Sequence, residues 1–269
     1  MKKIEFYIAI LFIPFVLLNC SSDSEYDDPG VVDGTARMEI RLTDAPSPYD
    51  EVNIDIRSIS VNSTNSETSG WREFSMIRPG VYNLLHFQNG IDTLLGVHNI
   101  PAGELRQIRL ELGSNNTVKQ NNYTYYIFAP TGKEEAITIK LDANLPANAT
   151  YKIWLDFDAA RSLVAHGMGF SLNPVIRTYT DRSGGIIEGV VLPSEANTRV
   201  WAYMGKDTLM TYPGPSGYYR FSGLTPSGSW KIVFDASNRT YYQDVVRENI
   251  TVTQGGLTVI PTVMHTVGK

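Results

Sequence analysis

The chain has 269 residues, a net charge of −5 and a single cysteine. A lone cysteine excludes a disulfide within the chain, and an acidic balance argues against the basic face that nucleic-acid binding needs. With 22 glycines, 15 tyrosines and only 19% charged residues, the composition favours short strands and turns over helices.

The N-terminal segment reads as a secretion signal. Residues 1–19 join a basic start to an apolar run from Phe6 to Leu18, which is short for a membrane span and contains Pro14. The following "LLNC" resembles a bacterial lipobox, in which Cys20 is acylated. The "SSDS" after it resembles the surface-export signal of Bacteroidetes lipoproteins. This resemblance implies a lipid-anchored protein of the bacterial outer membrane that faces the cell exterior.

An acidic segment separates the signal from the rest of the chain. Residues 20–35 contain five acidic residues and no basic one. Such a segment, with Pro and Gly and few large apolar groups, is typical of a disordered tether. Because the tether carries most of the charge, the chain from Arg37 onward is nearly neutral.

Alternating apolar residues predict a first β domain over residues 36–180. The phase slips at Arg57–Ser58, which predicts a bulge or bend, and one short helix is expected around residues 89–97. The segments with the period of two are "MEIRL", "VNIDI", "QIRLEL" and "AITIKL".

A second β domain is expected over residues 184–269, after a linker that contains Ser183, Gly184 and Gly185. Its apolar segments recur every 8–12 residues between Gly, Pro and Ser turns, which suggests a small sandwich of about seven strands. The sequence therefore predicts an all-β fold: two β-sandwich domains in tandem behind a signal peptide and a disordered acidic tether.

Both units resemble known families. The second resembles the carboxypeptidase regulatory-like domain, a transthyretin-type sandwich, in "IIEGVV", "RVWAY", "GYYRFSGL" and "WKIVF". This resemblance implies a support or binding module without catalytic residues. The first resembles the domain of unknown function 4382 of bacterial surface lipoproteins, in "LTDAP", "IPAGELRQIRLEL", "LDFDAARS" and "GFSLNPVI". The resemblance of the first unit implies an all-β fold and a place on the bacterial surface, but it implies no established activity.

Asp156 and Asp158 flank a phenylalanine on an expected strand. Their side chains would project side by side, about 6.5 Å apart, whereas the carboxylates of a glycosidase face each other across a cleft. Lys152 and Arg161 would keep both acids ionised, so we interpret them as solvated or turn-capping. A calcium site shared with Asp44 and a hydrolase are the alternatives.

Aromatic residues are the candidates for ligand binding. Alternation through residues 123–128 places Tyr126 opposite Ile127, and Trp154 falls on the polar side of its own strand. Exposed rings offer flat apolar area with a polar tip, as sugar-binding surfaces do. We therefore predict that Tyr126 and Trp154 contact a carbohydrate; tyrosine-rich strand packing is the alternative.

Two "DTL" tripeptides, at residues 92–94 and 207–209, resemble the acceptor of Bacteroidetes O-glycosylation. The resemblance makes Thr93 and Thr208 candidate modification sites.

The sequence thus predicts a non-catalytic binding or adhesion lipoprotein of the cell surface, with carbohydrate as the ligand class. No zinc, P-loop or GxSxG motif is present, so no cofactor is expected beyond a structural calcium. The expected partners are the outer membrane, through the lipid anchor, and a glycan or a partner surface protein. A structural subunit of an envelope assembly and a hydrolase that uses Asp156 and Asp158 are the alternatives.

Overall fold

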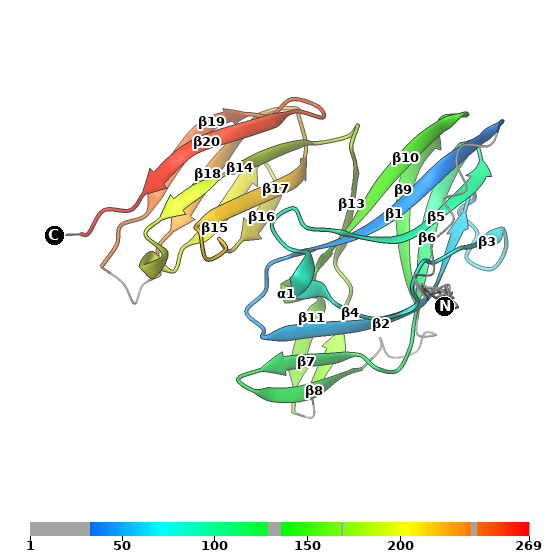
Figure 1. The fold of residues 1–269 in the computed structure, drawn as a ribbon, viewed down its shortest axis with the longest axis horizontal. Helices are drawn as coiled ribbons and strands as arrows, with labels where there is room; N and C mark the ends of the chain where they lie inside the picture. The colour runs from blue at the N-terminus through cyan, green and yellow to red at the C-terminus, as the bar shows by residue number, and fades with distance from the viewer. Residues whose placement is uncertain (1–32, 129–135, 168, 238–240, 269) are drawn as a thin grey trace, which may run out of the picture.

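The computed structural model describes residues 33–128, 136–167, 169–237 and 241–268. Nearly all regular structure is β, which confirms the predicted fold class, and the strands form two units that lie side by side (Figure 1). Among these described residues, no helix is long and apolar enough to cross a membrane.

The first unit contains two sheets. The smaller sheet has the strand order β13-β10-β1-β5. The larger has the order β11-β12-β8-β7-β2-β6-β9, and β3 and β4 also pair with β2. The elements are β1 (Thr35–Ala45), β2 (Glu51–Asn62), β3 (Trp71–Phe74), β4 (Gly80–Asn83), η1 (Leu84–Phe87), β5 (Thr93–Pro101), β6 (Gly103–Leu112), β7 (Thr117–Gln120), β8 (Tyr123–Phe128), β9 (Ala136–Leu145), β10 (Ala149–Asp158), α1 (Ala159–Ser162), β11 (Leu163–His166), β12 (Gly169–Leu172) and β13 (Ile176–Thr180).

The core of the first unit follows the alternation of its strands. On β10, Ile153, Leu155 and Phe157 are at most 2% exposed and pack in one cluster with the inward residues of β1 and β2. The predicted irregularity on β2 is also confirmed, because its register with β6 shifts between Ile56 and Ser58.

The helix expected around residues 89–97 is wrong. Most of this segment forms β5, which pairs antiparallel with β1 and buries Leu95 and Val97. Pairing with a central strand outweighs local helix preference here. One helical turn lies earlier in the chain, in η1, where Asn83 accepts a hydrogen bond from the Leu85 backbone N–H at 3.2 Å.

The second unit is a sandwich with seven strands among its described residues. Its sheets have the strand orders β17-β14-β20 and β16-β15-β18-β19. Trp230, Tyr219 and Phe234 are the largest side chains of its separate core. The elements are β14 (Gly185–Leu192), η2 (Ser194–Ala196), β15 (Arg199–Met204), β16 (Asp207–Thr211), β17 (Tyr218–Leu224), β18 (Ser229–Asp235), β19 (Val245–Thr251) and β20 (Leu257–Met264).

Polar contacts join the two units. The Asn89 side chain donates to the Tyr212 carbonyl at 3.1 Å and accepts from the Thr211 hydroxyl at 3.0 Å. The Tyr179 ring lies against Gly223, where an added Cβ would stand 2.3 Å from the ring. Only a residue without a side chain fits there, so the two units approach each other closely at β13 and β17.

We predict that residues 36–180 and 184–269 fold as separate fragments, because each buries its own apolar cluster. Each fragment should show one cooperative transition by differential scanning calorimetry. Each should also melt below the full chain, because the junction contacts are lost. A fragment without a cooperative transition would show that it needs the other unit to fold.

Candidate functional site

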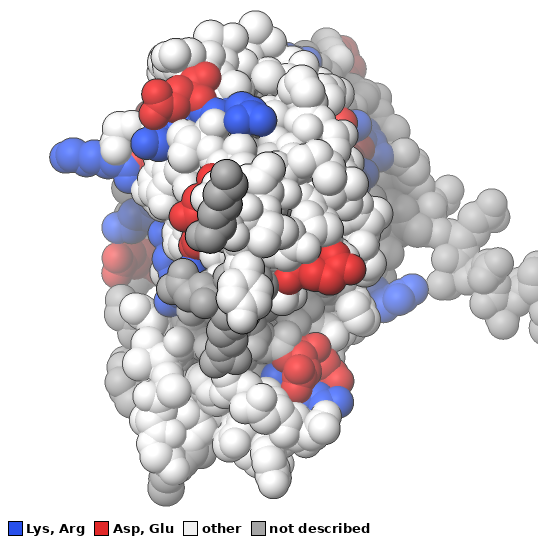
Figure 2. Space-filling model, turned by 90° about the vertical axis from the view of Figure 1, so that its left-hand side faces the viewer, with Lys and Arg blue, Asp and Glu red and all other residues white. Residues whose placement is uncertain are grey.

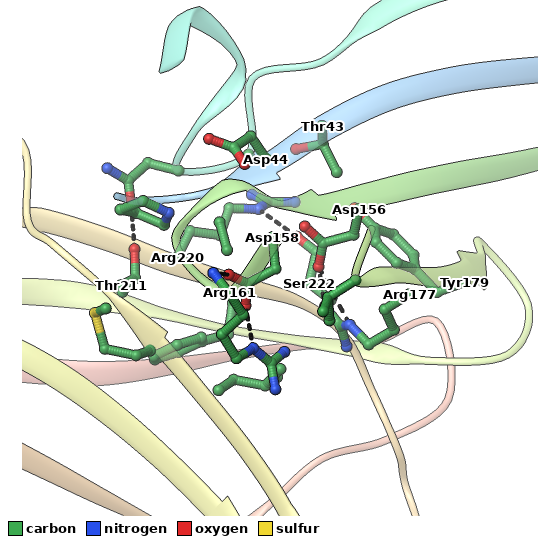
Figure 3. A pocket seen from close by; sticks show the side chains of 18 residues that line it. Thr43, Asp44, Asp156, Asp158, Arg161, Arg177, Tyr179, Thr211, Arg220 and Ser222 are labelled. Carbon is green, nitrogen blue, oxygen red and sulfur yellow. Dashed lines mark hydrogen bonds and ion pairs between the residues drawn. The ribbon is translucent and has the colours of Figure 1, made fainter. Parts of the chain in front are cut away.

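The polar groups of the junction surround a small pocket of about 60 Å³, shown in Figure 3. Strands β1 and β10 run parallel, with Thr43 paired to Asp156 and Ala45 to Asp158. This register brings Asp44, Asp156 and Asp158 to one end of the sheet, where they meet β16 and β17. A pocket of this size holds water molecules rather than a ligand.

Asp156 orients Arg177, which forms hydrogen bonds with the second unit. The Arg177 guanidinium donates to the Asp156 carboxylate from Nη2 at 2.6 Å and from Nε at 3.2 Å. The same guanidinium donates to the backbone carbonyls of Ser222 at 2.8 Å and Gly223 at 3.0 Å. Asp156 therefore has a structural role at the junction, and Arg177 is a residue that sequence patterns did not single out.

Asp158 caps the short helix α1. Its carboxylate accepts from the Arg161 backbone N–H at 2.8 Å and from Arg161 Nε at 2.6 Å. Both contacts come from within one turn of the chain, so they form as soon as the turn does.

Asp44 is the most buried of the three acids, with 4% of its surface exposed. One oxygen accepts from the Ala159 backbone N–H at 3.1 Å, and the other from Gln88 Nε2 at 3.4 Å. Burial, with smaller contributions from the negative charges of Asp156 and Asp158, raises the pKa of Asp44 well above its ordinary value. Asp44 therefore keeps its proton to a higher pH than an ordinary Asp does.

This arrangement gives the calcium hypothesis no support. Within the described residues, no group of three or more His, Cys, Asp or Glu side chains is placed to hold a metal ion. Calcium prefers several ionised oxygen ligands, whereas Asp156 and Asp158 are ion-paired with arginines and burial raises the pKa of Asp44. The same ion pairs leave Asp156 and Asp158 without the free carboxylates that the hydrolase alternative needs.

The two predicted aromatic contacts do not lie together. Trp154 is on the smaller sheet, half-buried, with its ring stacked on Tyr179 at a centroid distance of 5.4 Å and an angle of 3°. Its indole N–H donates to Asp92 at 2.7 Å. Tyr126 is on the larger sheet and is 69% exposed. Trp154 therefore packs at the junction and does not form the exposed platform expected with Tyr126.

Tyr126 instead belongs to an exposed group that we call the aromatic shelf: Tyr126 and Phe128 of β8, with Val164 and His166 of β11. Tyr126, Val164 and Phe128 are 69%, 53% and 44% exposed, and the Phe128 and His166 rings lie 5.6 Å apart. Gly169 of β12 lies between the two strands. A Cβ on Gly169 would stand 3.3 Å from the Phe128 ring, so the glycine leaves room for the ring over the strand.

Alternation alone places Tyr126 and Phe128 on one face of β8. His166 could not have been found in this way, because β11 reaches β8 only through β12, some forty residues later in the chain.

The candidate modification sites lie on different units. Thr93 is half-buried at the start of β5, and Thr208 is exposed on β16. Cys20 lies outside the described residues.

The buried acid predicts an unusual pH dependence. A carboxyl whose pKa is higher in the folded than in the unfolded chain holds its proton longer when folded, so stability falls as pH rises above about 4, the ordinary Asp value. Asp44→Asn, which cannot ionise, should therefore lose less stability than wild type as pH rises. Chemical denaturation across this range is the measurement, with exposed Asp181→Asn as the control. Equal pH slopes in Asp44→Asn and wild type would contradict the prediction.

Known structures offer only distant similarity. The Bacillus anthracis TIE protein is 11% identical over 87% of this chain, with a TM-score of 0.23, and this chain covers 34% of its length. The minor pilin GBS52 of Streptococcus agalactiae is 9% identical, with coverages of 86% of this chain and 97% of the pilin and a TM-score of 0.24. A shaft pilin SpaA variant from Lactobacillus rhamnosus GG is 8% identical, with coverages of 88% and 99% and a TM-score of 0.24. These scores are too low to support a functional argument.

No curated protein matches the chain. One family model does, over residues 35–174, which begins with β1 and ends just before β13. The match covers just over half of the chain, so the protein belongs to the family described as domain of unknown function DUF4382.

Proposed function

We propose that the protein is a non-catalytic binding or adhesion module of the bacterial cell surface that holds a carbohydrate on the aromatic shelf. The observation that carries the proposal is the exposure of Tyr126 and Phe128 on β8 and of Val164 on β11, two strands of one sheet with β12 between them. An exposed group of large apolar side chains marks an interaction site, and rings held on strands can stack against the apolar face of a sugar.

The charge distribution agrees with a ligand recognised by contact rather than by long-range attraction. Figure 2, a view from the second-unit end of the molecule, shows Lys, Arg, Asp and Glu scattered over a largely uncharged face. Such a surface steers charged ligands weakly. Tyr126, Phe128 and Val164 carry no charge, so a neutral glycan suits the shelf better than a polyanion.

We place the module on the outer membrane through lipidated Cys20 and the acidic tether. The second unit, by its resemblance to carboxypeptidase regulatory-like domains, would act as a support or an additional binding module. A flexible acidic tether between the lipid and the first unit would let the chain present the shelf to large ligands at the cell exterior.

A structural subunit of an envelope assembly is the second candidate. β20 is an edge strand, and its Leu257, Val259 and Met264 are 54%, 61% and 57% exposed. Uncharged, exposed edge strands are templates for pairing with a strand of another chain. A chain that binds no glycan but captures a partner through β20 would favour this candidate.

Replacing Tyr126 or Phe128 with Ala should weaken glycan binding by about 1–3 kcal/mol, the range of an interface aromatic, without unfolding the domain, because both rings are exposed. A glycan array on residues 36–269 identifies the ligand, and titration calorimetry measures the change. Tyr241→Ala, at an 85% exposed tyrosine of the second unit, is the matched control. Wild-type affinity in both shelf variants would refute the shelf as the binding site.

Cys20 should be lipidated and residues 1–19 removed. Cells labelled with a palmitate analogue should incorporate it into the wild-type protein, and Cys20→Ala should remain unlabelled because it lacks the acceptor thiol. Equal labelling of the two proteins would rule out the anchor.

A further inference from the structure

A second, larger cavity of about 520 Å³ opens at the junction, on the side of the β15–β16 hairpin. We call it the hairpin cleft. Its walls come from α1 and β13 of the first unit and from β16 and the end of β17 of the second. Its volume lies within the roughly 300–1,000 Å³ of small-molecule sites, and none of its lining residues belongs to the aromatic shelf.

Lys206 brings an uncompensated positive charge to this cleft. It sits with Gly205 in the two-residue turn between β15 and β16, and Gly205 has a φ of +60° at the first turn position, where type II′ hairpins place glycine. The ammonium group makes no hydrogen bond or ion pair within the part of the chain that the structure describes. The tight turn holds the lysine at the cleft edge.

Arg161 supplies further donors from the opposite wall. Its backbone N–H and Nε bind Asp158, as Figure 3 shows, and its side chain is 58% exposed. The terminal Nη1 and Nη2 groups have no partner among the described residues. Arg177 lines the same cleft, but Asp156 and two carbonyls already occupy most of its donors.

The remaining polar groups of the cleft favour a hydroxylated ligand. Asp207, beside Lys206, is exposed and without a partner in the described residues, so its carboxylate can accept hydrogen bonds from hydroxyl groups. Thr178, Thr208 and Thr225 also line the cleft and add hydroxyl groups to its polar surroundings. Repulsion from the Asp207 charge disfavours a dianion such as phosphate more than a single carboxylate.

We propose that the hairpin cleft binds an acidic sugar of the hexuronic-acid class, with its carboxylate between Lys206 and Arg161 and its hydroxyls on Asp207 and the threonines. The planar fork of arginine matches a carboxylate, and lysine adds a point charge. The site is independent of the aromatic shelf.

The test is titration of the full mature chain with D-glucuronate, monitored by calorimetry, with D-glucose, acetate and inorganic phosphate as comparison probes. Lys206→Ala and Arg161→Gln should each weaken glucuronate binding roughly fivefold or more, the loss of a charge-assisted hydrogen bond. Lys140→Ala, an exposed lysine on β9, should bind as wild type. Binding should also weaken as salt is added.

Thermal melting of each variant identifies any loss of fold. If Arg161→Gln is destabilised, Lys206→Ala still tests the proposal, because Lys206 lies in an exposed turn. Wild-type affinity in Lys206→Ala would overturn the proposal, as would equal binding of glucose, acetate or phosphate. Tyr126→Ala should leave glucuronate binding unchanged. Wild-type glycan binding in Tyr126→Ala, with glucuronate binding intact, would thus count against the proposed function alone.

Discussion

β1 and β10 form the centre of the smaller sheet and pair in parallel from Ala36 and Ala149 to Ala45 and Asp158. Parallel pairing places the C-terminal ends of both strands at the same edge of the sheet. The polar residues that end the two strands are therefore concentrated where the second unit docks. The burial of Asp44, the capping of α1 by Asp158 and the contact of Asp156 with Arg177 all depend on this one register.

The Arg177 guanidinium links the two units through hydrogen bonds. Asp156 orients the fork, and the fork then binds two carbonyls of β17. Hydrogen bonds from a charged donor contribute about 1.5–3 kcal/mol each when well placed, although one third of the guanidinium is exposed and water competes with the ion pair. Gly223 contributes to the same junction, because its missing Cβ lets the Tyr179 ring approach the β17 backbone.

The period-two pattern predicted the strands and the inward faces correctly, since burial on a sheet follows alternation directly. It also placed Tyr126 and Phe128 on one face. It failed for residues 89–97, where pairing with β1 decides the structure, and for the Trp154 environment, because its stacking partner Tyr179 and its acceptor Asp92 lie on other strands. Contacts between distant strands, such as those of Arg177 and His166, leave no local signal in a single sequence.

The arrangement of β1 has a mechanical consequence. Its backbone is hydrogen-bonded on both sides, to β10 and to β5, and the chain enters it at Thr35. Tension applied at Thr35 along the strand axis would shear both ladders and load many hydrogen bonds together, instead of opening them one after another as in unzipping. The first unit should therefore resist a pull at Thr35 more strongly than it would if β1 were paired along one side alone.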